Sequence, residues 1–161
     1  MDEAKCILLA LTTTGKTLAT AESCTGGLLG KLLTDVPGAS NAYLGGVISY
    51  AYSVKKALLG VDARLLREKG AVCEEAALQM AQGVRQRLKA DYGVSVTGNA
   101  GPSADPKNQN VGEIYVACAD SSRSLCERLT LHGSREENRF AACKAALLLL
   151  LRMHEENTEK A

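Results

Sequence analysis

The chain has 161 residues, 46% of them hydrophobic, and a formal net charge of +1, which predicts one soluble domain with a sizeable buried core. Lys and Arg are scattered among Asp and Glu, so the sequence shows no cluster of basic residues that could bind a nucleic acid. With no Trp and only 4% aromatic residues, it also offers no platform on which bases could stack.

Apolar spacing in the first half of the chain predicts alternating helices and strands. In chain order we expect a helix near residues 4–11, a strand over 17–21, a helix from about Thr25 to just before Pro37, a strand over 43–50, and short helices near 53–59 and 62–69.

The second half continues the alternation. Residues 74–89 predict a helix whose apolar stripe is formed by Ala77, Ala81, Val84 and Leu88. We then expect a buried strand over 92–97, a loop over 98–106, a hairpin of strands over 112–119 and 124–131, and a long closing helix. Because no internal repeat or linker interrupts this order, residues 1–161 are expected to form a single three-layer α/β/α domain with a mixed sheet.

The most informative feature is the junction that follows the strand over 17–21. It carries two hydroxyls, a thiol and a glycine pair, in the order Ser23, Cys24, Thr25, Gly26 and Gly27. At such a junction a nucleophile is exposed, and the unpaired N–H groups of the next helix point at an anion in front of it. Ligands in open α/β sheets bind at strand ends, so we expect this junction and the loop 98–101 to lie at one site.

Several familiar motifs are incomplete. Residues 26–32 resemble a phosphate loop, but the glycines are one residue too close and Leu32 replaces the Ser or Thr that would hold magnesium. A Ser-His-Asp triad would need His132 or His154, and we expect His154 to lie in a frayed polar tail. Residues 53–56 match the S-x-x-K spacing of the penicillin-recognising enzymes without their companion motifs, so Ser53 is interpreted as a helix N-cap.

The six cysteines include no CxxC pair and no Cys/His cluster of metal spacing, so we expect buried free thiols and no metal. The polar start shows no signal peptide, which favours a reducing cytoplasm. The apolar run over 141–151 is shorter than the roughly 20 residues that a bilayer requires, so no membrane partner is expected.

Seven short motifs follow one another between residues 17 and 151. They are AESCTGG at 21–27, SY with a lysine five residues on (Ser49, Tyr50, Lys55), LGV at 59–61, GAV at 70–72, TGNAGP at 97–102, VG at 111–112, and the arginines at 135 and 139. In this order they resemble the CinA C-terminal domain family, which contains the bacterial nicotinamide-nucleotide amidases. AESCTGG and the GxAGP loop are the most specific of them.

The resemblance implies deamidation of nicotinamide mononucleotide to nicotinic acid mononucleotide and ammonia, without a cofactor, in pyridine nucleotide salvage. It implies Ser23 as nucleophile and Lys55 as base, with Tyr50 beside them to relay a proton or donate to the oxyanion. A lysine of reference pKa about 10.4 can be such a base only if its pKa falls toward 7, through desolvation or a nearby cation such as Arg139. On the residues alone, Lys55 would be interpreted as a solvated helix lysine, and Tyr50 as a core residue with a wet hydroxyl.

The residues expected to bind the substrate are Cys24, Thr25, Gly26, Gly27, Gly98, Ala100, Gly101, Arg135 and Arg139. Arginine binds phosphate oxygens in a bidentate manner, although two arginines at i and i+4 among glutamates are also typical of a helix surface. The small residues of the 98–101 loop would let the backbone approach the ring. Oxyanion donors would be the N–H groups of residues 24–26, whereas the Cys24 thiol should point away from Ser23 and pack.

Three positions depart from the family pattern. Asn99 stands where an aliphatic residue is usual, Cys73 where serine is common, and Ser134 where an acidic residue often precedes the arginine. Asn99 could alter the pocket or the substrate preference. The chain also lacks the large N-terminal domain of many members, so we expect a stand-alone form or an excised piece.

Leucines over residues 147–151 surround the closing helix on every side, and one sheet face cannot cover them all. We therefore expect a homo-oligomer, most simply a two-fold dimer. Two other functions remain open from the sequence: an enzyme acting on another small amide or ester, and a catalytically silent nucleotide-binding or regulatory module of the same fold.

Overall fold

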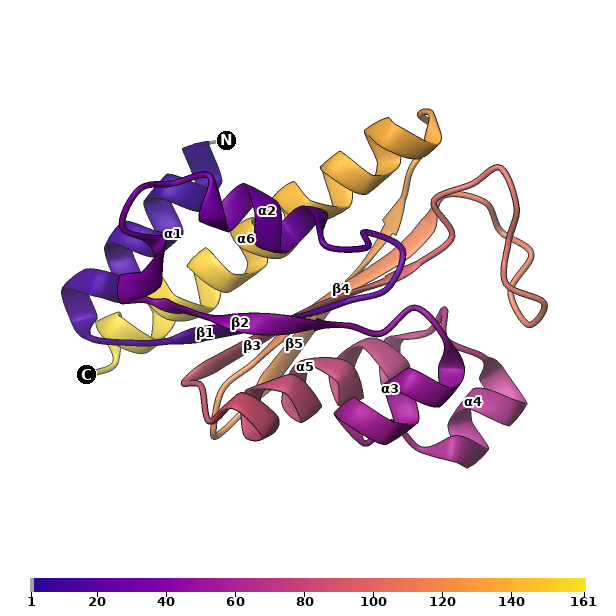
Figure 1. Ribbon diagram of the computed structural model, residues 1–161, viewed down its shortest axis with the longest axis horizontal. Coiled ribbons are helices and arrows are strands. Elements are labelled where there is room, and N and C mark those ends of the chain that lie inside the picture. The colour runs from indigo at the N-terminus through magenta and orange to yellow at the C-terminus, as the bar shows by residue number, and fades with distance from the viewer. Residues whose placement is uncertain (1) are drawn as a thin grey trace.

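Two layers of helices enclose a five-stranded sheet in the computed structural model, which describes residues 2–161 (Figure 1). The helices are α1 (Asp2–Thr14), α2 (Leu28–Thr34), the 3-10 helix η1 (Ala39–Asn41), α3 (Tyr52–Leu59), α4 (Ala63–Lys69), α5 (Glu74–Leu88) and α6 (Arg135–Glu159). The strands are β1 (Leu18–Glu22), β2 (Tyr43–Ile48), β3 (Tyr92–Gly98), β4 (Glu113–Ala119) and β5 (Ser124–Thr130).

The sheet has the strand order β2-β1-β3-β4-β5. Strand β1 pairs in parallel with β2 and with β3, and β3, β4 and β5 pair in antiparallel fashion. The expected three-layer fold with a mixed sheet is therefore confirmed. Because β1, β2 and β3 run the same way, their carboxyl ends meet at one edge of the sheet.

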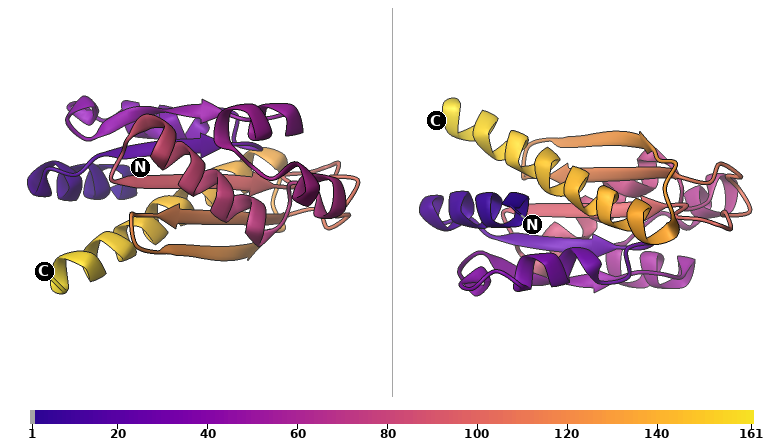
Figure 2. Two further views of the ribbon diagram at one scale, coloured as in Figure 1. Left: turned by 90° about the horizontal axis from the view of Figure 1, so that it is seen from below. Right: turned by 90° about the horizontal axis from the view of Figure 1, so that it is seen from above.

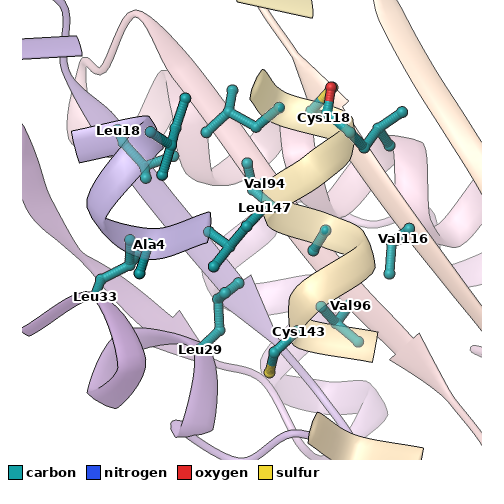
Figure 3. Packing of buried hydrophobic residues seen from close by; sticks show 14 of the residues in the cluster. Ala4, Leu18, Leu29, Leu33, Val94, Val96, Val116, Cys118, Cys143 and Leu147 are labelled. Carbon is teal, nitrogen blue, oxygen red and sulfur yellow. The ribbon is translucent and has the colours of Figure 1, made fainter. Parts of the chain in front are cut away.

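One face of the sheet is covered by α1, α2 and α6, and the other by α3, α4 and α5 (Figure 1). Helix α6 crosses its face obliquely (Figure 2). The larger core cluster lies under this helix, where Leu147 and Cys143 meet Val94 and Val96 of β3 (Figure 3). Burying side chains of this size stabilises the fold by about 1.5–3 kcal/mol for each Val, Leu or Ile.

On the opposite face, α5 approaches the sheet closely because its contact positions are small. Ala77 and Ala81 are fully buried against the sheet with Ala117. Gly93 on β3 leaves room for the backbone of α5, since a Cβ there would lie 2.0 Å from the Ala81 carbonyl oxygen. The apolar stripe predicted for this helix is confirmed, with Leu88 packing at the margin of the neighbouring cluster.

Three local predictions are wrong. Helix α2 begins at Leu28 rather than near Thr25, because Gly26 and Gly27 adopt left-handed backbone angles, with φ of 55° and 106°. Ser53 is not an N-cap, since α3 begins one residue earlier and Ala51 occupies the cap position without a side-chain hydrogen bond.

The third wrong prediction concerns His154, which lies in helix α6 and not in a frayed tail. Its side chain is 3% exposed, between α1 and the start of β3. Nδ1 lies 3.0 Å from the Tyr92 hydroxyl and Nε2 lies 3.3 Å from Thr14 Oγ1. Burial lowers the pKa of this imidazole, as expected for a cation that loses its hydration.

All six cysteines are free thiols, but not all are buried: Cys6 is exposed, and Cys73 and Cys126 are partly so. Within residues 2–161, no helix combines the length and apolar character that crossing a bilayer would take.

Candidate active site

The site lies where the carboxyl ends of β1, β2 and β3 meet. Ser23 follows β1, the Ser49-Tyr50 pair follows β2, and Asn99 follows β3. A cavity of about 240 Å³ opens between these strand ends, helix α3 and the loop over residues 99–112. The predicted convergence of the Ser23 junction with the 98–101 loop is thus confirmed.

Ser23 and Lys55 are in direct contact at the wall of this cavity. The Lys55 Nζ lies 2.8 Å from Ser23 Oγ, 2.6 Å from the Ser49 carbonyl oxygen and 3.2 Å from that of Tyr50. Lys55 is 1% exposed and Ser23 is 8% exposed. When the amine is neutral, the two carbonyls can accept its two N–H groups, and its lone pair is then free to accept the proton of Ser23.

Burial lowers the pKa of Lys55 to about 8, and the nearby Cys24 and Asp105 partly oppose this effect. A buried ammonium loses hydration that the neutral amine does not need, so desolvation favours the neutral form. With a pKa of about 8, about one lysine in ten is neutral at pH 7. The geometry and the protonation state both suit a general base.

The Cys24 thiol packs, as expected, although the residue also borders the cavity. Burial raises its pKa to about 11, so the nucleophilic thiolate is scarce at neutral pH. Of the two residues, Ser23 is therefore the one better suited to act as a nucleophile.

The N-terminal end of α2 is occupied by a side chain of this protein. The Glu22 carboxylate accepts hydrogen bonds from the N–H groups of Gly27, Leu29 and Gly30, at 3.2, 2.8 and 3.0 Å. The N–H groups at the start of this helix, which the sequence suggested for an anion, are thus already satisfied. Sequence reasoning missed Glu22, because it is the last residue of β1 and lies six residues before the helix begins at Leu28.

Arg139 holds the turn that follows Ser23. Its Nε donates to the Cys24 carbonyl at 3.0 Å and its Nη2 to the Thr25 carbonyl at 2.8 Å. Thr25 is fully buried. Five of the residues predicted to bind the substrate are not among the described residues that line the cavity: Thr25, Gly26, Gly27, Gly101 and Arg139. The structure does not bring these five into the pocket.

Arg135 and Tyr50 form the rim on the side of α6. Arg135 donates from Nη1 to the Gly101 carbonyl at 2.7 Å and from Nη2 to the Tyr50 hydroxyl at 3.2 Å. Tyr50 is 63% exposed, and its contact with Lys55 is made by its backbone carbonyl. Asn138, which the sequence did not single out, donates to the Ala100 carbonyl at 3.0 Å and fixes the same loop.

Asn99 organises the loop over residues 99–112. Its amide nitrogen donates to the carbonyls of Asn108 and Asn110, at 2.9 and 3.0 Å, and its amide oxygen accepts from the Asp105 N–H at 2.8 Å. An aliphatic residue could make none of these bonds, so Asn99 determines the shape of this wall. Neighbouring Gly98 is needed for sheet packing, since a Cβ there would lie 2.5 Å from the Cα of Ile114.

Cys73 and Ser134, the other two positions that depart from the family pattern, lie at helix ends and do not line the cavity. Cys73 is the N-cap of α5 and makes no side-chain cap. Ser134 caps α6 in a reciprocal arrangement with Glu137, which satisfies two N–H groups at the start of that helix.

The cavity also contains residues that sequence reasoning missed. Tyr52 and Asp105 line it, and the Tyr52 hydroxyl donates to the Asp105 carboxylate. Thr97, at the end of β3, also borders it and donates to the Ala71 carbonyl at 2.8 Å. The only sequence signal was the spacing of Tyr52, three residues before Lys55 on the same helix face.

A family model described as the CinA C-terminal domain matches residues 2–154. The CinA-like protein of Geotalea uraniireducens is 48% identical over 127 residues, covering 79% of this chain and 30% of that protein. The CinA-like protein of Syntrophomonas wolfei is 41% identical over 146 residues, covering 91% of this chain and 35% of that protein. The chain thus spans about a third of the length of these curated relatives.

Solved structures are similar along the whole length. The competence/damage inducible protein CihA from Agrobacterium tumefaciens superposes with a TM-score of 0.90 at 35% identity, covering 94% of this chain and 93% of that chain. A CinA superfamily protein from Klebsiella pneumoniae gives a TM-score of 0.92 at 26% identity, covering 96% and 97%. By its sequence and its fold, this chain belongs to the CinA C-terminal domain family.

Proposed function

We propose that this chain is an amidohydrolase that deamidates nicotinamide mononucleotide to nicotinic acid mononucleotide and ammonia in cytoplasmic pyridine nucleotide salvage. The observation that carries the proposal is the 2.8 Å contact between Ser23 Oγ and the buried Lys55 Nζ at the cavity wall. The six free thiols support a reducing compartment.

In the proposed reaction, neutral Lys55 takes the proton of Ser23 as its oxygen bonds to the carboxamide carbon. The Gly26 N–H donates to the Ser23 carbonyl at 3.0 Å, which leaves the N–H groups of Cys24 and Thr25 as the candidate oxyanion donors. Lys55 then gives its proton to the amide nitrogen as the carbon–nitrogen bond breaks and ammonia leaves. Finally, Lys55 takes a proton from the water that attacks the acyl-serine and returns it to the Ser23 oxygen as the ester bond breaks, which releases the acid product and restores both residues.

Arg135 is the best placed cation for the phosphate. Its guanidinium lies on the rim and borders the cavity, and its planar donors suit phosphate oxygens. Gly98 and Ala100 also border the cavity, where they offer backbone to the ring. We assign Thr25, Gly26, Gly27 and Arg139 to holding the Ser23 turn, because they lie outside the cavity lining.

The deciding experiment measures ammonia release from nicotinamide mononucleotide by the purified chain with a chelator present. Ser23→Ala and Lys55→Met should each lose activity by at least about 10³-fold, since nucleophile and base act as a unit, and should still bind the substrate. Ser53→Ala and Lys56→Met, two exposed neighbours on α3, are matched controls that should keep it.

The alternatives predict other results. Ammonia release from a different amide in a panel of pyridine and non-pyridine amides would indicate another amidase. Binding of the mononucleotide without turnover, in the wild type as in Ser23→Ala, would indicate a silent nucleotide-binding module.

A further inference from the structure

Two residues of the cavity wall have no role in the proposed reaction. Tyr52 lies in the first turn of α3, three residues before Lys55, so the two side chains project from the same face of the helix. The Tyr52 hydroxyl donates to Asp105 Oδ2. Asp105 comes from the loop over residues 99–112, on the other side of the cavity.

Asp105 is fixed from several directions at once. Its Oδ1 accepts from the Lys107 N–H at 2.9 Å, and its own N–H donates to the Asn99 side chain at 2.8 Å. The end of α4 lies against the same point: a Cβ on Gly70 would lie 2.7 Å from Asp105 Oδ1 and 2.9 Å from the Tyr52 hydroxyl. The carboxylate therefore joins helix α3 to the loop, and the end of α4 packs closely against it.

We propose that Tyr52 and Asp105 form a positioning pair for Lys55: their hydrogen bond ties the helix that carries the base to the loop, and the carboxylate acts on the amine by its charge. The inference rests on the proposed role of Lys55 as the base. Both residues act through Lys55, so neither needs to touch the reacting atoms.

The charges around Lys55 support the electrostatic half of this proposal. From the turn after β1 it faces Ser23 and a neutral Cys24 thiol, and from the end of β2 two backbone carbonyls. Arg135 of α6 is the other cation of the cavity. Tyr52 is neutral, since burial and then Asp105 raise its pKa to about 12.

Cys24 and then Asp105 raise the pKa of Lys55 against the effect of burial. Because the thiol is neutral at pH 7, Asp105 is the anion in this set. An anion stabilises the ammonium form, so removing its charge should make the neutral amine more abundant at a given pH.

Two variants separate the effect of the Asp105 charge from that of its hydrogen bond with Tyr52. Asp105→Asn removes the charge and keeps an oxygen that can accept from Tyr52. The acidic limb of its kcat/KM profile should move to lower pH by about half a unit or more, which is a roughly threefold gain on that limb. Tyr52→Phe keeps the charge and removes the hydrogen bond that positions the base, so the acidic limb of its profile should stay in place while kcat falls. Asp35→Asn, at the exposed end of α2, is the matched control.

A measurement without substrate tests the same proposal. Lysine labelled with 13C at Cε reports the titration of each amine by NMR, and the Lys55→Met spectrum identifies the Lys55 signal. Its midpoint should fall in Asp105→Asn and stay in Tyr52→Phe and Asp35→Asn. A Lys55 midpoint that does not move in Asp105→Asn overturns the proposal. If the midpoint moves but no ammonia is released from the mononucleotide, the proposed function fails and the action of Asp105 on Lys55 stands.

Discussion

Lys55 is buried at a cost in stability that depends on pH. Its pKa falls from 10.5 in the unfolded chain to about 8 in the fold, which corresponds to about 3 kcal/mol of folding free energy. Between these two values the unfolded chain binds more protons than the folded one, so stability rises with pH. Below about pH 8 the full penalty is present.

Replacing Lys55 by Met should therefore change the pH dependence of unfolding. The free energy of unfolding of Lys55→Met, relative to the wild type, should fall by up to about 3 kcal/mol as the pH rises from 7.5 to 10. Urea unfolding at several pH values measures this difference. Lys56→Met, one residue along and exposed, should show no such trend, and a flat difference for Lys55→Met would contradict a depressed pKa.

At the scale of single residues, the sequence singled out Ser23 and Lys55 as candidate site residues, because both belong to short motifs that follow one another in a fixed order. Tyr52, Asp105 and Asn138 escaped prediction because their partners are far away in the sequence, with separations of 53 residues for Tyr52–Asp105 and 38 for Asn138–Ala100. Contacts over such distances arise from the fold and leave no local spacing to read.

Helix α2 is stabilised at its start by Glu22, which is 3% exposed and accepts from three backbone N–H groups. Glu22→Gln keeps the shape but loses the charge and one acceptor oxygen. We expect it to destabilise the protein by about 1–3 kcal/mol. Because Ser23 is the next residue, the same variant should also lower the activity.

Urea unfolding at pH 7 measures this effect. Glu68→Gln is the matched control, since its carboxylate pairs with Arg64 on an exposed surface and such pairs contribute about 0–1 kcal/mol. Equal stability of Glu22→Gln and the wild type would show that the carboxylate does not support α2.

Most elements could be predicted from apolar periodicity, because every strand of the central sheet is bounded by polar or glycine-containing turns. The start of α2 could not, since the left-handed Gly26 and Gly27 and the Glu22 cap shift it to Leu28. Helix propensity depends on neighbouring residues, so it does not predict a cap that is supplied by a residue of the preceding strand.

At the scale of the molecule, the alternation of helices and strands was sufficient to predict the three layers of the fold. It did not predict how much of the surface of α6 is buried by the rest of the chain. The expectation of an oligomer rested on leucines around the whole helix. In the fold, Leu147, Leu149 and Leu150 are at most 2% exposed, and Leu148 is 45% exposed. Helix α1 and the sheet together cover more of α6 than a single sheet face could.

The dimer stays a prediction, and the structure narrows the surface that can form it. The large exposed apolar side chains on the α1 and α6 layer are Leu9, Phe140 and Leu148. If this layer forms the interface, light scattering at micromolar concentration should give twice the mass of the chain, and Leu148→Glu should give the single mass, because a buried unpaired charge opposes association. Leu58→Glu, on α3 in the opposite layer and 39% exposed, should leave the dimer intact. A wild-type chain that scatters as a monomer would refute the association, whereas a dimer dissociated by Leu58→Glu and not by Leu148→Glu would move the interface to the other layer.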